Sequence, residues 1–242
     1  MEEEENIRVD FSAHALVNPF DTIKNSQESF ATLKKLSELG FSKVLLTPRY
    51  IKKPNTYASV TNLKKQRKEL EVALRYSGAN ISLGVASEIF ITPDIGKLIF
   101  SGNIILLSRK NILIKLPEQK TVSVRKIKPI LESLVKHHYV PILMCPEKCA
   151  CLWEQPDEVK NLSAIGVMFA CSFKSICGMN GRSAERLMSW MLRNGYCDLL
   201  ATETSSADDE ILTKFAKAEK KVLRLIGKDS YEKIMRSADG IF

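Results

Sequence analysis

The sequence has no long apolar run, and only three of its 242 residues are histidine. No stretch approaches the ~20 apolar residues of a membrane-spanning helix, so we expect no direct membrane insertion. The chain starts with an acidic segment, Met1 to Glu5, whereas a secretory signal starts with basic residues. We therefore expect a cytoplasmic protein. The scarcity of histidine argues against a histidine-rich metal centre.

Linkers and sequence repeats are also missing. No segment rich in proline, glycine or serine divides the chain, and no period of roughly 20 to 50 residues recurs. We predict one domain over residues 1–242, with an acidic tail at 1–6 and a C-terminal helical extension at 226–242. The six cysteines lack the density of a disulfide-rich secreted domain, so we expect reduced thiols.

The charge is unbalanced towards the basic side, with 36 Lys plus Arg against 28 Asp plus Glu and a net charge of +8. Such an excess is compatible with nucleic acid, an acidic membrane surface or an anionic ligand. The basic runs around Lys64 and Lys214 lie in helical patterns and contain interspersed glutamates, which is typical of solvated helix faces. No RNA-binding motif is present, so we expect no nucleic-acid partner.

Short β-branched runs alternate with amphipathic segments along nearly the whole chain. We predict strands at Ile7 to Phe11, Lys43 to Thr47, Asn80 to Val85, Ile104 to Leu107, Asn111 to Leu116, Val140 to Met144, Gly166 to Ala170 and Cys197 to Ala201. We predict helices at Gln27 to Leu39, Thr61 to Tyr76, Val124 to His138, Asp157 to Leu162, Arg182 to Asn194 and Asp208 to Leu225. This alternation predicts an α/β fold with a parallel sheet, either a barrel or a doubly wound sheet.

Polar side chains follow almost every predicted strand. In both architectures, ligands bind at the carboxyl ends of the strands, so these residues are candidates for one site. The candidates are Ser12, His14, Arg49, Glu88, Lys115, Cys145, Lys148, Glu203 and Ser205. An ordinary polar rim around a barrel mouth is the alternative interpretation.

The same positions form short motifs in a recognisable order. They are Val9-Asp10-Phe11-Ser12-Ala13-His14, Thr47-Pro48-Arg49, Ser87-Glu88-Ile89, Ile114-Lys115, Cys145-Pro146-Glu147-Lys148 and Glu203-Thr204-Ser205. From about Arg8 to Ile211, the sequence resembles the bacterial PHP-domain (polymerase and histidinol phosphatase) family, in particular the manganese-dependent tyrosine phosphatases of capsular polysaccharide biosynthesis. The resemblance implies a distorted (β/α)7 TIM-like barrel of the PHP type.

The resemblance also assigns metal ligands, and most of them are replaced here. His14 and Glu88 match ligand positions, and Glu203 is a longer carboxylate at a third. The other ligand positions hold Ser12, Arg49, Lys115, Cys145 and Ser205. Lys148 stands where the family has an arginine that holds substrate phosphate. A cation about 4 Å from a divalent ion costs several kcal/mol even at an effective dielectric of about 20, so we expect no complete manganese centre.

These replacements predict a pseudophosphatase linked to capsular or exopolysaccharide biosynthesis. Arg49, Lys115 and Lys148 would bind an anion or phosphate without hydrolysing it. The ligand would be the phosphotyrosine of a partner protein, such as a capsule-regulating tyrosine kinase. Alternatively, Lys115 and Glu203, or Arg49 and Glu88, merely neutralise each other in a filled-in barrel mouth.

Two other functions remain open at this point. One is an active phosphoesterase or protein-tyrosine phosphatase with a reduced site, in which His14, Glu88 and Glu203 hold manganese or another divalent metal. The other is an interaction scaffold that binds neither metal nor anion.

A cluster of thiols follows one of the central strands, in the order Cys145-x3-Cys149-x-Cys151. Zinc sites usually contain Cys-x2-Cys pairs or matched histidines, and this spacing differs from both. We therefore expect reduced cysteines rather than a structural zinc ion, and no nucleophilic role for Cys145.

Overall fold

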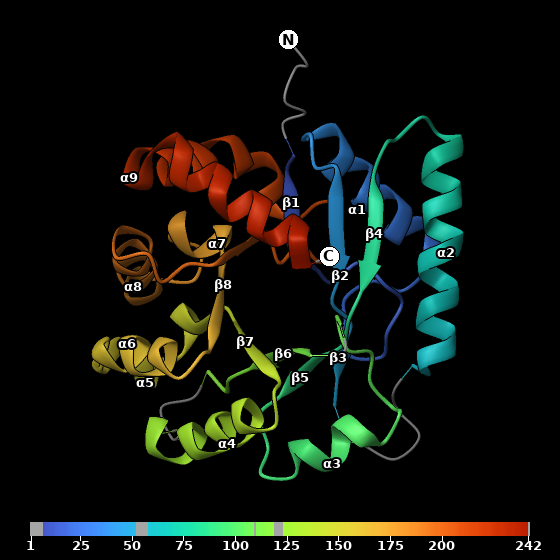
Figure 1. The fold of residues 1–242 in the computed structure, drawn as a ribbon. Helices are drawn as coiled ribbons and strands as arrows, with labels where there is room; N and C mark the ends of the chain where they lie inside the picture. The colour runs from blue at the N-terminus through green and yellow to red at the C-terminus, as the bar shows by residue number, and fades with distance from the viewer. Residues whose placement is uncertain (1–6, 52–57, 109, 119–122, 242) are drawn as a thin grey trace.

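The computed structural model describes residues 7–51, 58–108, 110–118 and 123–241 (Figure 1). The strands are β1 (Val9–Ala13), β2 (Lys43–Leu46), β3 (Arg49–Tyr50), β4 (Ser82–Val85), β5 (Glu88–Phe90), β6 (Asn111–Lys115), β7 (Val140–Met144), β8 (Met168–Ser172) and β9 (Leu199–Ala201). The helices are α1 (Ser26–Glu38), α2 (Val60–Tyr76), α3 (Ile95–Phe100), α4 (Val124–Lys136), α5 (Ala150–Glu154), α6 (Asp157–Ala164), α7 (Phe173–Ile176), α8 (Arg182–Arg193) and α9 (Glu210–Ile241), with the 3-10 helix η1 (Pro146–Lys148).

All of the strand pairings are parallel. One sheet has the order β1-β2-β4, and the other has the order β3-β5-β6-β7-β8-β9. Only two residues separate β2 from β3 and β4 from β5, so each pair continues in the same direction from one sheet into the other. A parallel bridge between Ala13 and Thr204 then joins β1 to the segment after β9. The pairings therefore return to the first strand, and the predicted α/β class with parallel strands is confirmed.

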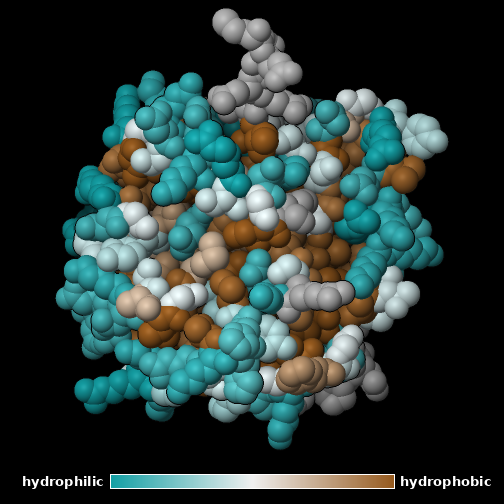
Figure 2. Space-filling model, viewed as in Figure 1, coloured by the Kyte–Doolittle hydropathy of each residue, from teal (hydrophilic) through white to brown (hydrophobic). Residues whose placement is uncertain are grey.

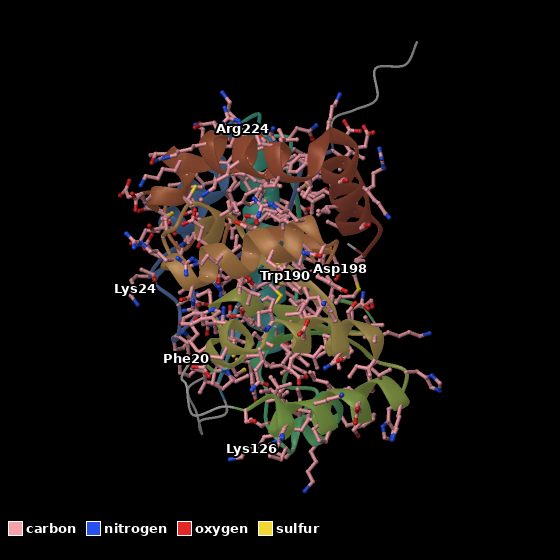
Figure 3. The ribbon with its side chains drawn as sticks, turned by 90° about the vertical axis from the view of Figure 1, so that its left-hand side faces the viewer. Phe20, Lys24, Lys126, Trp190, Asp198 and Arg224 are labelled. Atoms are coloured by element: carbon pink, nitrogen blue, oxygen red, sulfur yellow. The ribbon has the colours of Figure 1, made fainter. Side chains whose placement is uncertain are left out.

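Helices surround these strands. In Figure 1, α1 and α2 lie beside β2 and β4, whereas α4 to α9 lie on the opposite side of the molecule. Seen from that side, α9, α8 and α4 are stacked from top to bottom (Figure 3). Side-chain oxygens fix several helix starts: Asn25 accepts from the backbone N–H of Glu28 at the start of α1, and Ser59 accepts from that of Asn62 at the start of α2.

Apolar side chains of the strands and of the inner helix faces form the core. Phe11, Phe169 and Phe173 are among its largest fully buried residues. On the outer surface, Figure 2 shows apolar side chains gathered near the middle of one face and hydrophilic side chains around them. None of the described helices has the length and apolar character that a membrane crossing requires.

The structure corrects the sequence prediction at residues 104–107, which form no strand. Ile105 instead bonds to the loop before β5, where its carbonyl accepts from the backbone N–H of Ser87 at 2.8 Å and its N–H donates to Ser87 Oγ at 3.0 Å. A short apolar run looks the same in a buried loop as in a strand, so the pattern could not distinguish the two. The last helix, α9, continues into the segment 226–242, for which we predicted a helical extension, and reaches Ile241 across a non-helical Gly227 with φ of 79°.

Candidate functional site

The carboxyl ends of the strands place the predicted polar residues in one cluster. Lys115 ends β6 and Glu203 follows β9, whereas Arg49 and Glu88 lie just beyond the carboxyl ends of β2 and β4, where they begin the short strands β3 and β5. Arg49 also donates a hydrogen bond to the backbone carbonyl of Phe20 at 3.5 Å. Figure 3 shows Phe20 at the left edge of the molecule, below Lys24. The strand-end rule therefore identified residues that the fold does bring together.

At one side of the cluster, two lysines share one carboxylate. Lys115 Nζ lies 3.2 Å from Glu203 Oε1, and Lys148 Nζ lies 3.5 Å from the same oxygen. Burial opposes ionisation of Glu203, but the two ammonium groups hold its pKa well below the ordinary value. Burial likewise disfavours a charged Lys115, yet neighbouring Cys145, Glu203 and Glu88 raise its pKa well above the ordinary value. Glu203 and Lys115 therefore form a buried ion pair.

The backbone around Glu203 explains how this carboxylate reaches the cluster. Glu203 has φ of 51°, in the left-handed region. Its N–H donates to the Ser12 carbonyl at 2.9 Å, and its own carbonyl accepts from Lys174 Nζ at 2.8 Å. Asp10 supports the same junction, since its carboxylate accepts from the Thr202 N–H at 2.7 Å and from Thr202 Oγ1 at 2.6 Å.

On the other side of the cluster, Arg49 lies between two buried carboxylates. Its Nη1 is 3.5 Å from Asp21 Oδ1, and its Nε is 3.7 Å from Glu88 Oε2. Both distances exceed those of a charge-assisted hydrogen bond, and the Arg49 side chain is 37% exposed. Burial raises the pKa of Glu88 and of Asp21, while the Arg49 charge opposes this rise in both.

His14 lies between the same carboxylates and is almost fully buried. Its Nδ1 is 2.8 Å from the Thr47 carbonyl, which can only accept, so Nδ1 carries the proton and donates. Burial and the nearby Arg49 charge lower the pKa of His14 to about 3, which leaves the ring neutral. Its Nε2 therefore presents a lone pair, 3.9 Å from Glu88 Oε2, and has no hydrogen-bond partner among the described residues.

The remaining candidates make internal hydrogen bonds or are deeply buried. Ser12 Oγ is 2.6 Å from Thr47 Oγ1, and the Ser205 N–H donates to Asp209 Oδ2 at 3.0 Å. Cys145 is buried with φ of 50°, and burial raises the pKa of its thiol well above the ordinary value. Burial also raises the pKa of Glu147 to about 7.

The sequence interpretation missed Asp21 and Glu118. Asp21 contacts Arg49 and His14, and Glu118 Oε1 lies 3.1 Å from Lys148 Nζ. Both lie in loops beyond strand ends, so the rule that identified the other residues could have included them. Apart from this rule, no feature of the sequence marked Asp21 or Glu118 as a site residue.

These residues do not fit a centre of several divalent ions. His14 Nε2 and Glu88 Oε2 are suitable donor atoms. However, Arg49 and Lys115 place permanent or near-permanent cations beside them, and a cation repels a divalent ion. Within the described residues, no three His, Cys, Asp or Glu side chains are arranged to hold a metal ion.

Two solved structures share the fold. One comes from the crystal structures of YwqE from Bacillus subtilis and CpsB from Streptococcus pneumoniae, described as unique metal-dependent tyrosine phosphatases; it matches with a TM-score of 0.85 at 15% identity, over 96% of this chain and 92% of that one. The other is histidinol phosphate phosphatase from Lactococcus lactis, with zinc, L-histidinol and phosphate bound; its TM-score is 0.58 at 13% identity, over 89% of this chain and 93% of that one. No curated protein sequence matches the chain.

The strands are parallel, polar side chains lie at their carboxyl ends, and the fold of the chain matches that of these phosphatases. These features define an α/β protein with the PHP fold. A family model for capsular polysaccharide synthesis, CpsB/CapC, matches residues 8–240. The chain therefore belongs to the CpsB/CapC family.

Proposed function

We propose that this chain is a non-catalytic member of its family that binds an anionic or phosphorylated ligand without hydrolysing it. The observation that carries the proposal is the buried ion pair between Lys115 and Glu203, with Nζ and Oε1 3.2 Å apart at the centre of the strand ends. Metal-dependent hydrolysis needs an activated water molecule held by the metal. A centre whose positive charge comes from lysine supplies no such water.

Two of the three predicted cations can reach a ligand. Arg49 is 37% exposed and makes only long contacts to its carboxylates, so its donors can turn towards a phosphate at little cost. Lys148 is paired with Glu118, and such partly exposed pairs contribute little stability, so a ligand can compete with Glu118. Lys115 is committed to Glu203 and supports the ligand through its charge alone.

The partner in this proposal is a protein that bears phosphotyrosine, such as a capsule-regulating tyrosine kinase. The metal-dependent tyrosine phosphatases that share the fold support this choice of ligand. We further propose that the chain acts as a single domain in the cytoplasm. Its role would be to hold or shield the phosphorylated segment.

A second candidate function is favoured by His14. Its Nε2 is buried without a hydrogen-bond partner among the described residues, and its Nδ1–H donates to a backbone carbonyl, which is a common arrangement for a metal-binding histidine. In this alternative, His14, Glu88 and Glu203 hold one divalent ion and the chain is a hydrolase. Glu203 would have to leave Lys115 to take part.

The two candidates are separated by metal content, turnover and binding. The protein is purified without chelators, its metal content is measured, and a phosphotyrosine peptide is offered with and without added manganese. Calorimetric binding of the peptide without turnover supports the proposal. Stoichiometric metal with turnover supports the second candidate, and absence of both binding and turnover contradicts both and leaves an interaction scaffold.

A further inference from the structure

Two thiols lie in contact just beyond the candidate site. Cys149 Sγ and Cys151 Sγ are 3.1 Å apart, with only Ala150 between the two residues in the chain. Cys149 is buried, whereas Cys151 is partly exposed, so a reagent in solution can reach the pair from one side. The pair directly follows Lys148, whose ammonium contacts Glu118 and Glu203.

The surroundings of the pair favour one thiolate. Cys149 also donates to the Pro117 carbonyl at 3.5 Å, which holds its sulfur in place. A hydrogen bond from the Cys151 thiol lowers the pKa of Cys149, although burial opposes this effect. The same hydrogen bond, together with burial, raises the pKa of Cys151, so the thiolate, which is the reactive form of cysteine, lies on Cys149 at rest.

We propose that Cys149 and Cys151 are a redox-responsive dithiol that forms a reversible intrachain disulfide by exchange with a small-molecule disulfide such as oxidised glutathione. For the attack, the proton of Cys151 passes to Cys149 across the 3.1 Å contact, the exposed Cys151 attacks as a thiolate, and the disulfide reagent releases its first thiolate. Cys149 then gives its proton to that thiolate, attacks Cys151 in the mixed disulfide and expels the second thiolate, which takes up the proton lost from the dithiol. The dithiol is oxidised, and the reagent is reduced to two thiols.

The short loop makes such a disulfide easy to reverse. A bridge between residues two apart has little freedom to reach the preferred disulfide geometry. Strained or exposed disulfides have more oxidising potentials and belong to the labile, regulatory kind. The pair is therefore suited to report a change in thiol redox state rather than to stabilise the fold.

Peptide mapping of the full chain tests the proposal. The protein is incubated with oxidised glutathione, denatured, alkylated and cleaved after Lys and Arg. One peptide, Cys149 to Lys160, then contains both cysteines and no other cysteine. We expect neither cysteine of this peptide to be alkylated and its mass to be lower than that of the dithiol form by two hydrogen atoms. Excess dithiothreitol should reverse both changes. Two alkylated cysteines, two glutathione adducts or a cross-link to another cysteine would overturn the proposal.

Two variants complete the test. Cys151→Ser is expected to abolish the lighter peptide and to leave Cys149 as a thiol or a single glutathione adduct. Cys177→Ser, which leaves the pair intact, is expected to give the same lighter peptide as the unmodified sequence. If Cys151→Ser fails to fold, the mapping of the unmodified sequence alone decides between disulfide and free thiols.

Discussion

Lys115 Nζ lies 3.2 Å from Glu203 Oε1, although the two residues are 88 positions apart in the chain. Their side chains are only 8% and 6% exposed. Parallel strands deliver both side chains to the same end of the fold, where Lys148 adds a second ammonium 3.5 Å from the same oxygen. The candidate site of this family member therefore has a buried ion pair at its centre, formed by side chains of opposite charge.

Removing the lysine of this pair is expected to destabilise the fold. Lys115→Met keeps the apolar stem but leaves the Glu203 carboxylate buried with only the more distant Lys148, and we expect a loss of about 3 kcal/mol in the free energy of unfolding. Urea unfolding measures the loss. Lys115→Met combined with Glu203→Gln should recover most of it, because no unpaired charge stays buried. Lys214→Ala, which removes a lysine from an exposed i,i+4 pair with Glu210, is the control and should change little.

The stability of the protein should depend on pH through Asp10. Burial raises the pKa of Asp10 from 3.8 to about 7. Between these values the folded state keeps a proton that the unfolded chain has lost, so the free energy of unfolding falls as the pH rises, by up to about 1.4 kcal/mol per pH unit. Asp10→Asn cannot titrate and should lack this slope.

The measurement is urea unfolding of the unmodified sequence and of Asp10→Asn between about pH 4 and pH 8. Relative to that of Asp10→Asn, the free energy of unfolding of the unmodified sequence should fall as the pH rises to about 7 and then stay constant. His14, whose pKa is lowered to about 3, contributes a slope of the opposite sign, but it does so in both proteins and cancels. Parallel stability curves over the whole range would show that Asp10 is ionised in the folded state.

Anion binding should depend on Arg49. Arg49→Gln removes the guanidinium and is expected to weaken calorimetric binding of a phosphotyrosine peptide by roughly ten- to a hundredfold, since a hydrogen bond to a charged group is worth roughly 1.5 to 3 kcal/mol. Arg236→Gln is the matched control, because Arg236 lies on α9 in an exposed pair with Glu232. Equal affinity in both variants would place the ligand elsewhere on the molecule.

A metal site is expected to form when one cation of the candidate site is replaced by a neutral ligand and another by a carboxylate. In Arg49→His with Lys115→Glu, the new carboxylate and imidazole would join His14, Glu88 and Glu203, and the carboxylates would repel one another without a cation. We expect this double variant to unfold at a lower temperature than the unmodified sequence and to regain stability when manganese is added. Thermal unfolding with and without manganese checks this, with magnesium as the comparison ion. The idea fails if manganese stabilises the unmodified sequence as much as the double variant.

The fold and the membership of the site could be predicted to different extents. Periodicity identified most strands and helices, because alternating strands and amphipathic helices leave a clear pattern. It failed at residues 104–107, where the backbone N–H and carbonyl of Ile105 both form hydrogen bonds with Ser87 in a loop. It also missed β3 and β5, which have two and three residues and are too short to show a period.

The sequence alone determined that the ionisable residues meet at one end of a parallel sheet, because the direction of the chain fixes the end at which each strand finishes. The resemblance to the family also predicts that Arg49 and Lys115 place cations where relatives hold metal ligands. The pairs Lys115–Glu203 and Arg49–Glu88 could be named from the sequence as one alternative; only the tertiary structure decided that they form, and that Lys148 joins Glu203 and Asp21 joins Arg49. These partners come from loops and strands far apart in the chain. Their distances depend on register and on local backbone such as the left-handed Glu203, which no periodic pattern encodes.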